Sequence, residues 1–504
     1  MIWIIEHLLS TIIFLPLLLA VFLLVIPGTW ERAIRWVSLF GSLLILGVTM
    51  LAWRAMSWNA GFELQEVIPW IPSVGITYKL GVDGTAMLLM WLAAFLVPIV
   101  FIGSWREVSK NVKMFHVLIL LLETGMLGVF AALDVFLFYI FWEVVLIPMY
   151  FLIGMWGSGN RIRVAFKFIL YTMAGSVLML AAILYAAWQC GGTFDLLTWY
   201  DKGFNPIQQF WLFGAFALAF AIKVPMFPVH TWLPDTHTEA PTAGSVLLAG
   251  VLLKMGTYGF FRFAMPLFPL AVVKFAPLML TLSVIGIVYG ALVSLVQVDL
   301  KRLIAYSSVS HLGFVMLGLF SLEPHAVQGA IIQMINHGLS TGALFLMVGM
   351  IYHRRHSRLI ADYGGIARIV PMFAALFIFL SFASVGMPGL NNFVGEFLVL
   401  LGTFQTQTPY AAIAVLGVIL AAGYMLWAVQ RVFFGPITHD ENRALTDLTG
   451  REYLALLPLV ALIVAIGVYP KPWLSKIESS TEQFLKLTKR VEMIVPVAKN
   501  TTGE

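Results

Sequence analysis

Long apolar stretches separated by short polar connections repeat along the whole chain. Most of these stretches contain roughly the 20 residues that an α-helix needs to cross a bilayer. Their limits at charged residues, glycines and prolines predict fourteen membrane spans, with ends defined to within several residues. The spans are 8–26, 33–52, 84–103, 114–132, 135–155, 164–189, 208–224 with a broken continuation to about 238, 242–264, 273–296, 302–320, 327–352, 370–387 with a broken continuation to about 404, 410–434 and 453–470. The segment 471–504 is polar and partly amphipathic, which predicts a position at the membrane surface.

The composition agrees with this pattern. Hydrophobic residues make up 61% of the 504 residues and charged residues 11%, and the mean hydropathy is +0.93. A soluble domain carries about a quarter charged residues, so this chain has too little charge to cover a surface that faces water. The predicted fold class is therefore an all-α polytopic membrane protein, with about fourteen transmembrane helices in one membrane domain.

The basic residues are unevenly distributed over the predicted connections. Seventeen lie in the connections on one side, five lie in those on the other side, and six lie in the tail. Because Lys and Arg accumulate in cytoplasmic loops, this asymmetry predicts that both termini are external. The net charge of +5 is thus a signal of topology, and no nucleic-acid partner is predicted.

Two basic residues remain, and both lie inside predicted spans. An ionisable group in mid-bilayer costs about 2.5–3.5 kcal/mol on insertion scales. Lys254 lies roughly 18 Å into its helix at 1.5 Å per residue, too deep to reach the interface easily, and Lys223 has apolar residues on both sides. Glu143, roughly 13 Å deep by the same rise, is an acid that could pair with Lys223. A buried pair whose members shift each other's pKa can act as a proton switch, which we favour over simple structural pairing.

Further ionisable residues lie in apolar surroundings. Glu396 is a buried acid, and Glu123 is a deep acid for which a functional and a structural role are equally supported. His311 and His337 have the pKa range of a proton relay, although a lone buried histidine is as often a core residue, and haem ligation is weakly supported. Four polar residues follow the break in the seventh span, and their spacing suggests a metal site. A polar helix end with access to water is the favoured interpretation of these residues, which are His230, Asp235, His237 and Glu239.

Cofactor motifs give little support for redox chemistry on this chain. The single cysteine, Cys190, excludes internal disulfides and iron–sulfur clusters held by several cysteines. Neither a dinucleotide fingerprint nor a phosphate-binding loop is present. We therefore predict no cofactor and no metal on this chain.

Two spans are interrupted by helix breakers. Prolines break the seventh span at 223–228, and Gly and Pro break the twelfth at 385–392. Such breaks are tolerated in a membrane where protein or water satisfies the freed backbone groups, and each lies next to a buried charge. Their separation of five spans predicts inverted repeats. The predicted organisation is 1–112 with spans 1–3, 113–266 as the first repeat, 267–436 as the second repeat, and 437–504 with the last span and the tail.

Several longer motifs resemble the signature of the proton-translocating antiporter-like family. The match covers nearly the whole chain and is highly specific. Its segments are Lys223–Ser245, Val246–Gly259, Leu80–Gly84, Phe141–Pro148, Asp299–His311, Asn336–Ser340, Gly386–Gly389 and Asn392–Glu396. Within this family the segment 238–246 looks most like the M type of NADH:quinone oxidoreductase, respiratory complex I.

The resemblance implies specific roles. Glu143 and Lys223 would form the coupled pair of one half, Lys254 the central relay, and Glu396 the terminal group of the other half, with His311 and His337 on the connecting axis. NADH, flavin, iron–sulfur and quinone chemistry would lie on partner subunits of the membrane and peripheral arms, and neighbouring antiporter-like subunits would flank this chain in the bacterial inner membrane. A subunit of a multi-subunit Na+/H+ antiporter or of a membrane-bound hydrogenase is an alternative, and a passive assembly subunit is another.

Overall fold

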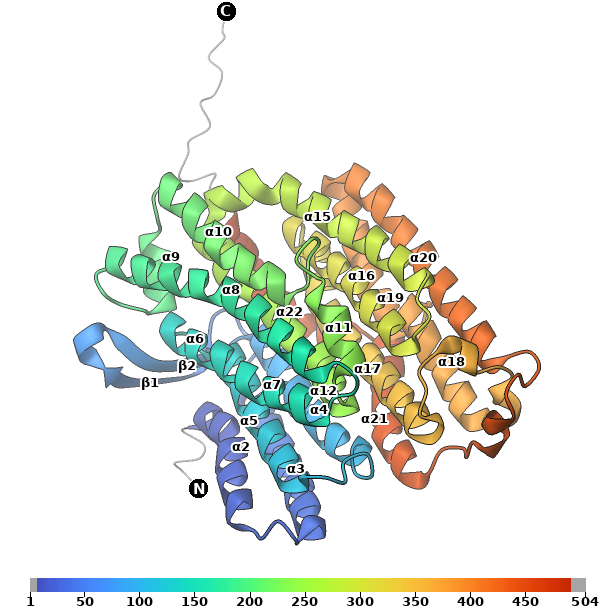
Figure 1. The fold of residues 1–504 in the computed structure, drawn as a ribbon. Helices are drawn as coiled ribbons and strands as arrows, with labels where there is room; N and C mark the ends of the chain where they lie inside the picture. The colour runs from blue at the N-terminus through green and yellow to red at the C-terminus, as the bar shows by residue number, and fades with distance from the viewer. Residues whose placement is uncertain (1–6, 491–504) are drawn as a thin grey trace, which may run out of the picture.

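The computed structural model describes residues 7–490, which form a bundle of helices with one small β-hairpin (Figure 1). The elements of the first half are α2 (Leu8–Val25), α3 (Glu31–Ala55), β1 (Glu63–Ile71), β2 (Ile76–Val82), α4 (Gly84–Gly103), α5 (Val112–Ala131), α6 (Val135–Val144), α7 (Leu146–Trp156), α8 (Arg161–Gln189), α9 (Leu196–Lys202), α10 (Pro206–Lys223), α11 (Trp232–Glu239), α12 (Thr242–Leu247), α13 (Leu253–Gly259) and α14 (Met265–Leu267). Those of the second half are α15 (Pro269–Leu295), α16 (Leu300–Phe320), α17 (Pro324–Arg355), α18 (Pro371–Val385), α19 (Asn391–Thr406), α20 (Thr408–Phe433), α21 (Gly450–Val468) and α22 (Lys471–Thr488).

Short π-helical and 3₁₀-helical segments lie between or beside the α-helices. Two π-helical segments, Leu248–Leu252 and Phe260–Ala264, join α12, α13 and α14 into one continuous helical rod. Turns of 3₁₀ helix lie at Pro72–Val74, Ile360–Asp362, Ile366–Arg368 and Asp440–Ala444.

The helical architecture predicted from the sequence is confirmed. Helices occupy all fourteen predicted ranges, and among the described residues twelve helices are long and apolar enough to cross a membrane. The two remaining ranges are the predicted broken spans, which form the pairs α10–α11 and α18–α19. The number of membrane crossings, fourteen, stays a prediction.

Acidic and amide side chains begin several helices at the ends of the bundle. The Asp83 carboxylate accepts a hydrogen bond from the Ala86 amide of α4, 2.9 Å away. Asp134 and Asp299 cap α6 and α16 in the same way, with two backbone amides each. A side-chain cap of this kind contributes about 0.5–2 kcal/mol, so these polar residues fix where helices start along apolar sequence.

The structure corrects the all-α prediction at one place. Residues 63–82 form an antiparallel hairpin in which Val67 pairs with Lys79 and Ile71 pairs with Ile76. The turn needs a left-handed residue, which Gly75 supplies at φ 74°. This hairpin holds the start of α2, because a Glu66 oxygen accepts the Leu9 amide at 2.8 Å.

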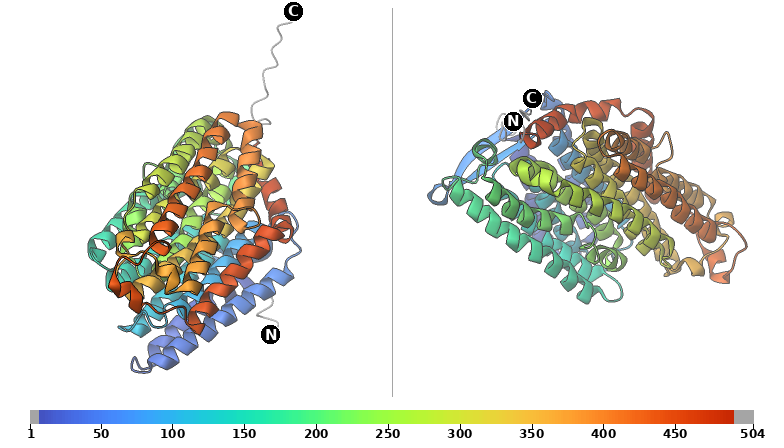
Figure 2. Two further views of the ribbon diagram at one scale, coloured as in Figure 1. Left: turned by 90° about the vertical axis from the view of Figure 1, so that its right-hand side faces the viewer. Right: turned by 90° about the horizontal axis from the view of Figure 1, so that it is seen from above.

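The helices share two common ends. The hairpin side contains β1, β2, α9 and α22, and the arginine side contains the turns at 104–111, 157–160 and 356–370. Backbone bonds join connections within each side, for example Leu133 N to Lys79 O at 2.9 Å and Leu300 N to Arg358 O at 2.9 Å. Figure 1 shows the hairpin at the left of the bundle, and Figure 2 shows α2 and α3 in blue along one edge. Both ends of the described chain lie on the hairpin side.

The predicted fifth span, 135–155, is confirmed as the candidate span Val135–Trp156, in which one turn residue, Val145, separates α6 from α7. One further expectation is corrected. Arg262, which the charge count assigned to a connection, lies inside the helical rod at 4% exposure. It is stable there because Asp83 pairs with it at 2.5 Å.

Candidate functional site

Ionisable side chains from different helices form a row across the middle of the bundle. All are buried except Glu143, which is half-buried. In order from the first half to the second they are Glu143 on α6, Lys223 on α10, Lys254 on α13, His337 on α17, His311 on α16 and Glu396 on α19.

Lys223 ends α10 at the first helix break. Its side chain is 1% exposed, and its Nζ lies 5.1 Å from the ring centre of Trp142 and 5.9 Å from that of Phe168. Glu143 is the charge that acts on this ammonium group, and Tyr139 hydrogen-bonds to Glu143. Within residues 7–490 Lys223 Nζ has no hydrogen-bond partner, so the pairing of Glu143 with Lys223 stays a prediction.

Lys254 lies fully buried at the centre of the row. Its Nζ lies 2.6 Å from His337 Nδ1 and also donates to the backbone oxygen of Ala249. The short α13 that carries it is flanked on both sides by the π-helical segments Leu248–Leu252 and Phe260–Ala264. Segments of this kind frequently occur at functional sites.

The row continues through two histidines to a carboxylate. The rings of His337 and His311 lie 5.8 Å apart between centres. His311 Nδ1 lies 2.7 Å from Glu396 Oε1, which also accepts from Gln333 Nε2 at 3.0 Å. The second ring nitrogen of His311 lies 3.3 Å from the Ser384 hydroxyl. The His337 and His311 rings thus lie between Lys254 and Glu396.

Both helix breaks have protein partners for their freed backbone groups. At the first break, the indole nitrogen of Trp232 donates to the backbone oxygen of Ile222 at 2.8 Å. At the second, the side-chain amides of Asn336 and Asn391 each donate to the other's backbone oxygen, at 2.7 and 3.1 Å. The breaks can therefore persist in an apolar environment.

Glycines let the functional helices approach one another closely. A Cβ atom at Gly256 would lie 2.9 Å from the backbone oxygen of Phe220, where α13 crosses α10. A Cβ atom at Gly329 would lie 2.8 Å from the backbone oxygen of Gly395, where α17 crosses α19. These contacts set the positions of Lys254 against Lys223, and of α17 against the helix of Glu396.

Glu123 stands apart from the row. It is fully buried in α5, and neither of its carboxylate oxygens has a hydrogen-bond partner in the described part of the chain. Its role as a relay stays a prediction.

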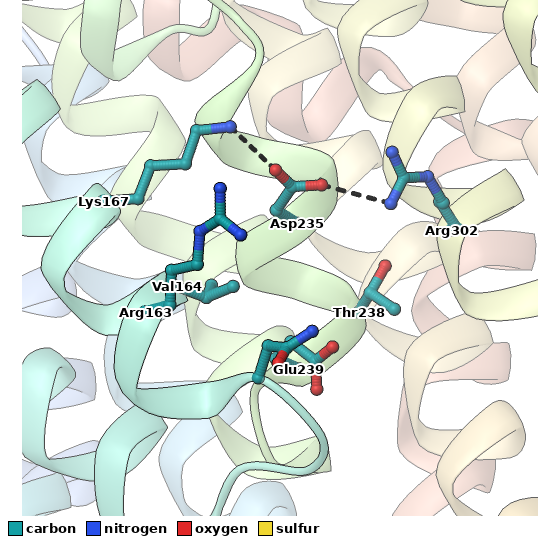
Figure 3. A pocket seen from close by; sticks show the side chains of 8 residues that line it. Arg163, Val164, Lys167, Asp235, Thr238, Glu239 and Arg302 are labelled. Carbon is teal, nitrogen blue, oxygen red and sulfur yellow. Dashed lines mark hydrogen bonds and ion pairs between the residues drawn. The ribbon is translucent and has the colours of Figure 1, made fainter.

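A pocket of about 390 Å³ lies on the arginine side, where α8, α11 and α16 meet (Figure 3). Asp235 lies at its edge, held by Lys167 at 2.7 Å and by Arg302 at 3.1 Å, which reach it from opposite sides. Arg163 and Glu239 also line this pocket. Two of the four residues considered for a metal site therefore line an open polar pocket at the end of α11.

The other two residues of that group are buried separately. His237 is fully buried and stacks on Phe345 with ring centres 4.5 Å apart. Among the described residues no group of three or more His, Cys, Asp or Glu could hold a metal ion.

Comparison with known proteins identifies the family. The family described as "NADH:quinone oxidoreductase/Mrp antiporter, TM" matches residues 132–421. The chain is 46% identical over 484 residues to the NADH-quinone oxidoreductase subunit M of Rhodobacter capsulatus, which covers 92% of this chain and 94% of that one. This chain belongs to the NADH:quinone oxidoreductase/Mrp antiporter family.

Two solved structures share the fold of this chain. A chain of respiratory complex I from Thermus thermophilus superimposes with a TM-score of 0.87 at 34% identity, covering 95% of this chain and 99% of its own. A chain of the Mrp complex from a Dietzia species has a TM-score of 0.85, covering 96% of this chain and 99% of its own, but is 18% identical, so it shows the shared fold alone. The likeness in sequence therefore favours the complex I branch of the antiporter-like family over the Mrp branch.

Proposed function

We propose that this chain translocates protons as an antiporter-like, membrane-arm subunit of NADH:quinone oxidoreductase. The observation that carries the proposal is the row of buried ionisable groups from Lys254 through His337 and His311 to Glu396. Each such group is costly in an apolar environment. A protein that only bridged neighbouring subunits would gain nothing from four buried ionisable groups placed one after another in space.

The proposed path has two parts. Glu143 and Lys223 form the switch of the first part, since the ammonium group of Lys223 has no hydrogen-bond partner within the described chain to hold its proton. Lys254 receives the proton at the centre, across the close contact of α10 and α13 at Gly256. The two imidazoles then carry it to Glu396, and Glu123 is a possible additional station outside the row.

The proposal also assigns surroundings to the chain. The arginine side faces the cytoplasm of a bacterial cell and the hairpin side faces outward, in the inner membrane. The repeats 113–266 and 267–436 each contain one broken helix and run in opposite senses. NADH, flavin, iron–sulfur and quinone chemistry takes place on partner subunits. This chain contributes the protonatable side chains of its own proton path, and it contacts neighbouring antiporter-like subunits.

The test uses the assembled complex in membrane vesicles with the variant His337→Gln. Glutamine keeps hydrogen-bonding capacity but cannot bind and release a proton at neutral pH, so proton translocation falls by about 10²–10⁴-fold, the usual contribution of one acid–base group, while assembly persists. The matched control is His116→Gln. His116 is also buried, at 2% exposure, and stacked on an aromatic ring, with centres 4.9 Å apart, but lies outside the row. Equal proton yields in the two variants would contradict the relay.

A further inference from the structure

A buried ion pair near the hairpin side takes no part in the proposed path. Arg262 and Asp83 lie 2.5 Å apart with side chains 5% and 2% exposed. Asp83 also caps α4 through its other oxygen. The guanidinium carbon lies 4.7 Å from the ring centre of Phe62 and 5.4 Å from that of Phe261. Such a pair is expensive to desolvate, so its retention calls for an explanation.

The pair ends a polar column that starts at the central lysine. Lys254, Tyr258 and Arg262 follow one another at spacings of four residues, which places them along one face of the helical rod. At 1.5 Å per residue, Tyr258 lies roughly 6 Å and Arg262 roughly 12 Å beyond Lys254 toward the hairpin side. Tyr258 and Arg262 therefore lie between the level of Lys254 and the hairpin side, although the Lys254 ammonium itself is bonded to the backbone oxygen of Ala249 and to His337.

The hydrogen bonds along this column oppose proton transfer. The Tyr258 hydroxyl donates to the backbone oxygen of Phe130 at 2.8 Å and accepts from Arg262 Nε at 3.1 Å. Its proton is thus directed away from the column, and its lone pair is occupied. Arg262 keeps its proton at any physiological pH, so it cannot pass a proton on, and its fixed positive charge repels an approaching one.

The outer end of the column is closed as well. The Tyr200 hydroxyl donates to the backbone oxygen of Arg262 at 2.5 Å, and Arg490 donates to the backbone oxygen of Tyr200 at 2.8 Å. Residues from α4, α9 and the segment after α22 therefore converge on the end of the rod at Arg262.

We propose that the Arg262–Asp83 pair is a proton barrier that seals the hairpin-side end of the Lys254 column. The barrier makes transfer from Lys254 through His337 the only conducting direction and prevents protons from leaking back across the membrane. This inference rests on the proposed function in one respect, which is that Lys254 carries a proton.

The experiment measures proton leak at rest in proteoliposomes that contain the purified complex. A pH gradient is imposed without NADH, its decay is followed with a fluorescent dye, and proton yield per NADH is then measured in the same vesicles. The main variant is Arg262→Gln with Asp83→Asn. Removing both charges avoids an unpaired buried ion, and asparagine preserves the cap of α4.

The barrier predicts a gradient decay at least about tenfold faster than in the unaltered complex, which corresponds to about 1.4 kcal/mol of barrier height. Arg262→Lys keeps the positive charge and should keep the decay slow. The matched control is Arg354→Gln with Glu452→Gln, a pair at 2.7 Å with side chains 13% and 8% exposed on the arginine side, which should not change the decay.

Two outcomes would overturn the barrier. They are an equal acceleration in the control and an unchanged decay in the main variant; an unchanged decay together with a loss of proton yield would make the column an exit route. The decay at rest does not depend on turnover. A failure of the proposed function, seen as unimpaired pumping without the row residues, is therefore distinguishable from a failure of the barrier.

Discussion

Replacing Lys254 and Glu396, the two ends of the second half of the row, distinguishes a proton path from a structural pair of charges. The changes are Lys254→Met, Glu396→Gln and the two together. Lys254 and Glu396 have no contact with each other, since each binds its own histidine, at 2.6 and 2.7 Å. A static charge pair would recover in the double variant, because removing both charges relieves the cost that a single removal leaves. A proton path would not recover.

The structure sets the expected magnitudes. Glu396 has two hydrogen-bond partners, His311 and Gln333, and a hydrogen bond to a charged group contributes about 1.5–3 kcal/mol against about 0.5–1.5 kcal/mol for a neutral one. The loss of about 2–3 kcal/mol leaves the complex assembled. Methionine replaces the lysine chain at similar length and removes a buried charge. By contrast, proton transfer through a missing station falls by about 10²–10⁴-fold.

The assay is proton uptake by inverted membrane vesicles upon NADH addition, normalised to assembled complex and compared with NADH:quinone turnover. We expect all three variants to assemble, each single variant to lose pumping, and the double variant to recover none. Pumping restored in the double variant would refute the path and assign Lys254 and Glu396 a structural role.

Three further predictions concern other parts of the molecule. Glu143→Gln or Lys223→Met should lower pumping and coupled quinone reduction strongly in assembled complex, and unchanged proton yield would remove this pair from the mechanism. Labels on the turn 353–368 should react from the cytoplasm and labels on the hairpin from outside; reversed accessibility would invert the proposed orientation. Gly329→Ala should reduce the amount of assembled complex, because its Cβ would lie 2.6 Å from a backbone nitrogen of α19 and overpacking costs about 1–3 kcal/mol. Gly423→Ala, with open space around it, should be neutral.

Local sequence patterns predicted the helices well because the bilayer imposes simple rules on them. Apolar length places each span, and proline and glycine placed the breaks after Lys223 and before Asn391. The turn residue Val145 inside the fifth span leaves no mark in the apolar pattern, because a single Pro148 is compatible with a span that continues through it. The hairpin was missed because two short strands with Pro69 inside one of them carry a weak strand signal.

The candidate residues could be found from the energetic cost of placing an ionisable side chain in an apolar helix. Their contacts with one another could not be predicted from the sequence. A lysine in an apolar helix is conspicuous, but its partner His337 lies 83 residues away in the sequence, and no local pattern encodes that distance. Glu123 shows the converse, because an equally costly position has no hydrogen-bond partner among the described residues. Arg262 was counted as a loop residue because its partner, Asp83, precedes it by 179 positions in the sequence.

The contact between α22 and the start of α4 has a consequence for biosynthesis. The Thr85 amide donates to the Ser480 hydroxyl, 395 residues later, and a Cβ atom on Gly84 would lie 1.7 Å from the backbone oxygen of Lys476. At about 5–20 residues per second, the ribosome needs roughly 20–80 s to supply that partner. Until then the start of α4 is uncovered, so a nascent chain depends on the insertion machinery or on lipid to protect it. The bundle closes only after α22 has been made.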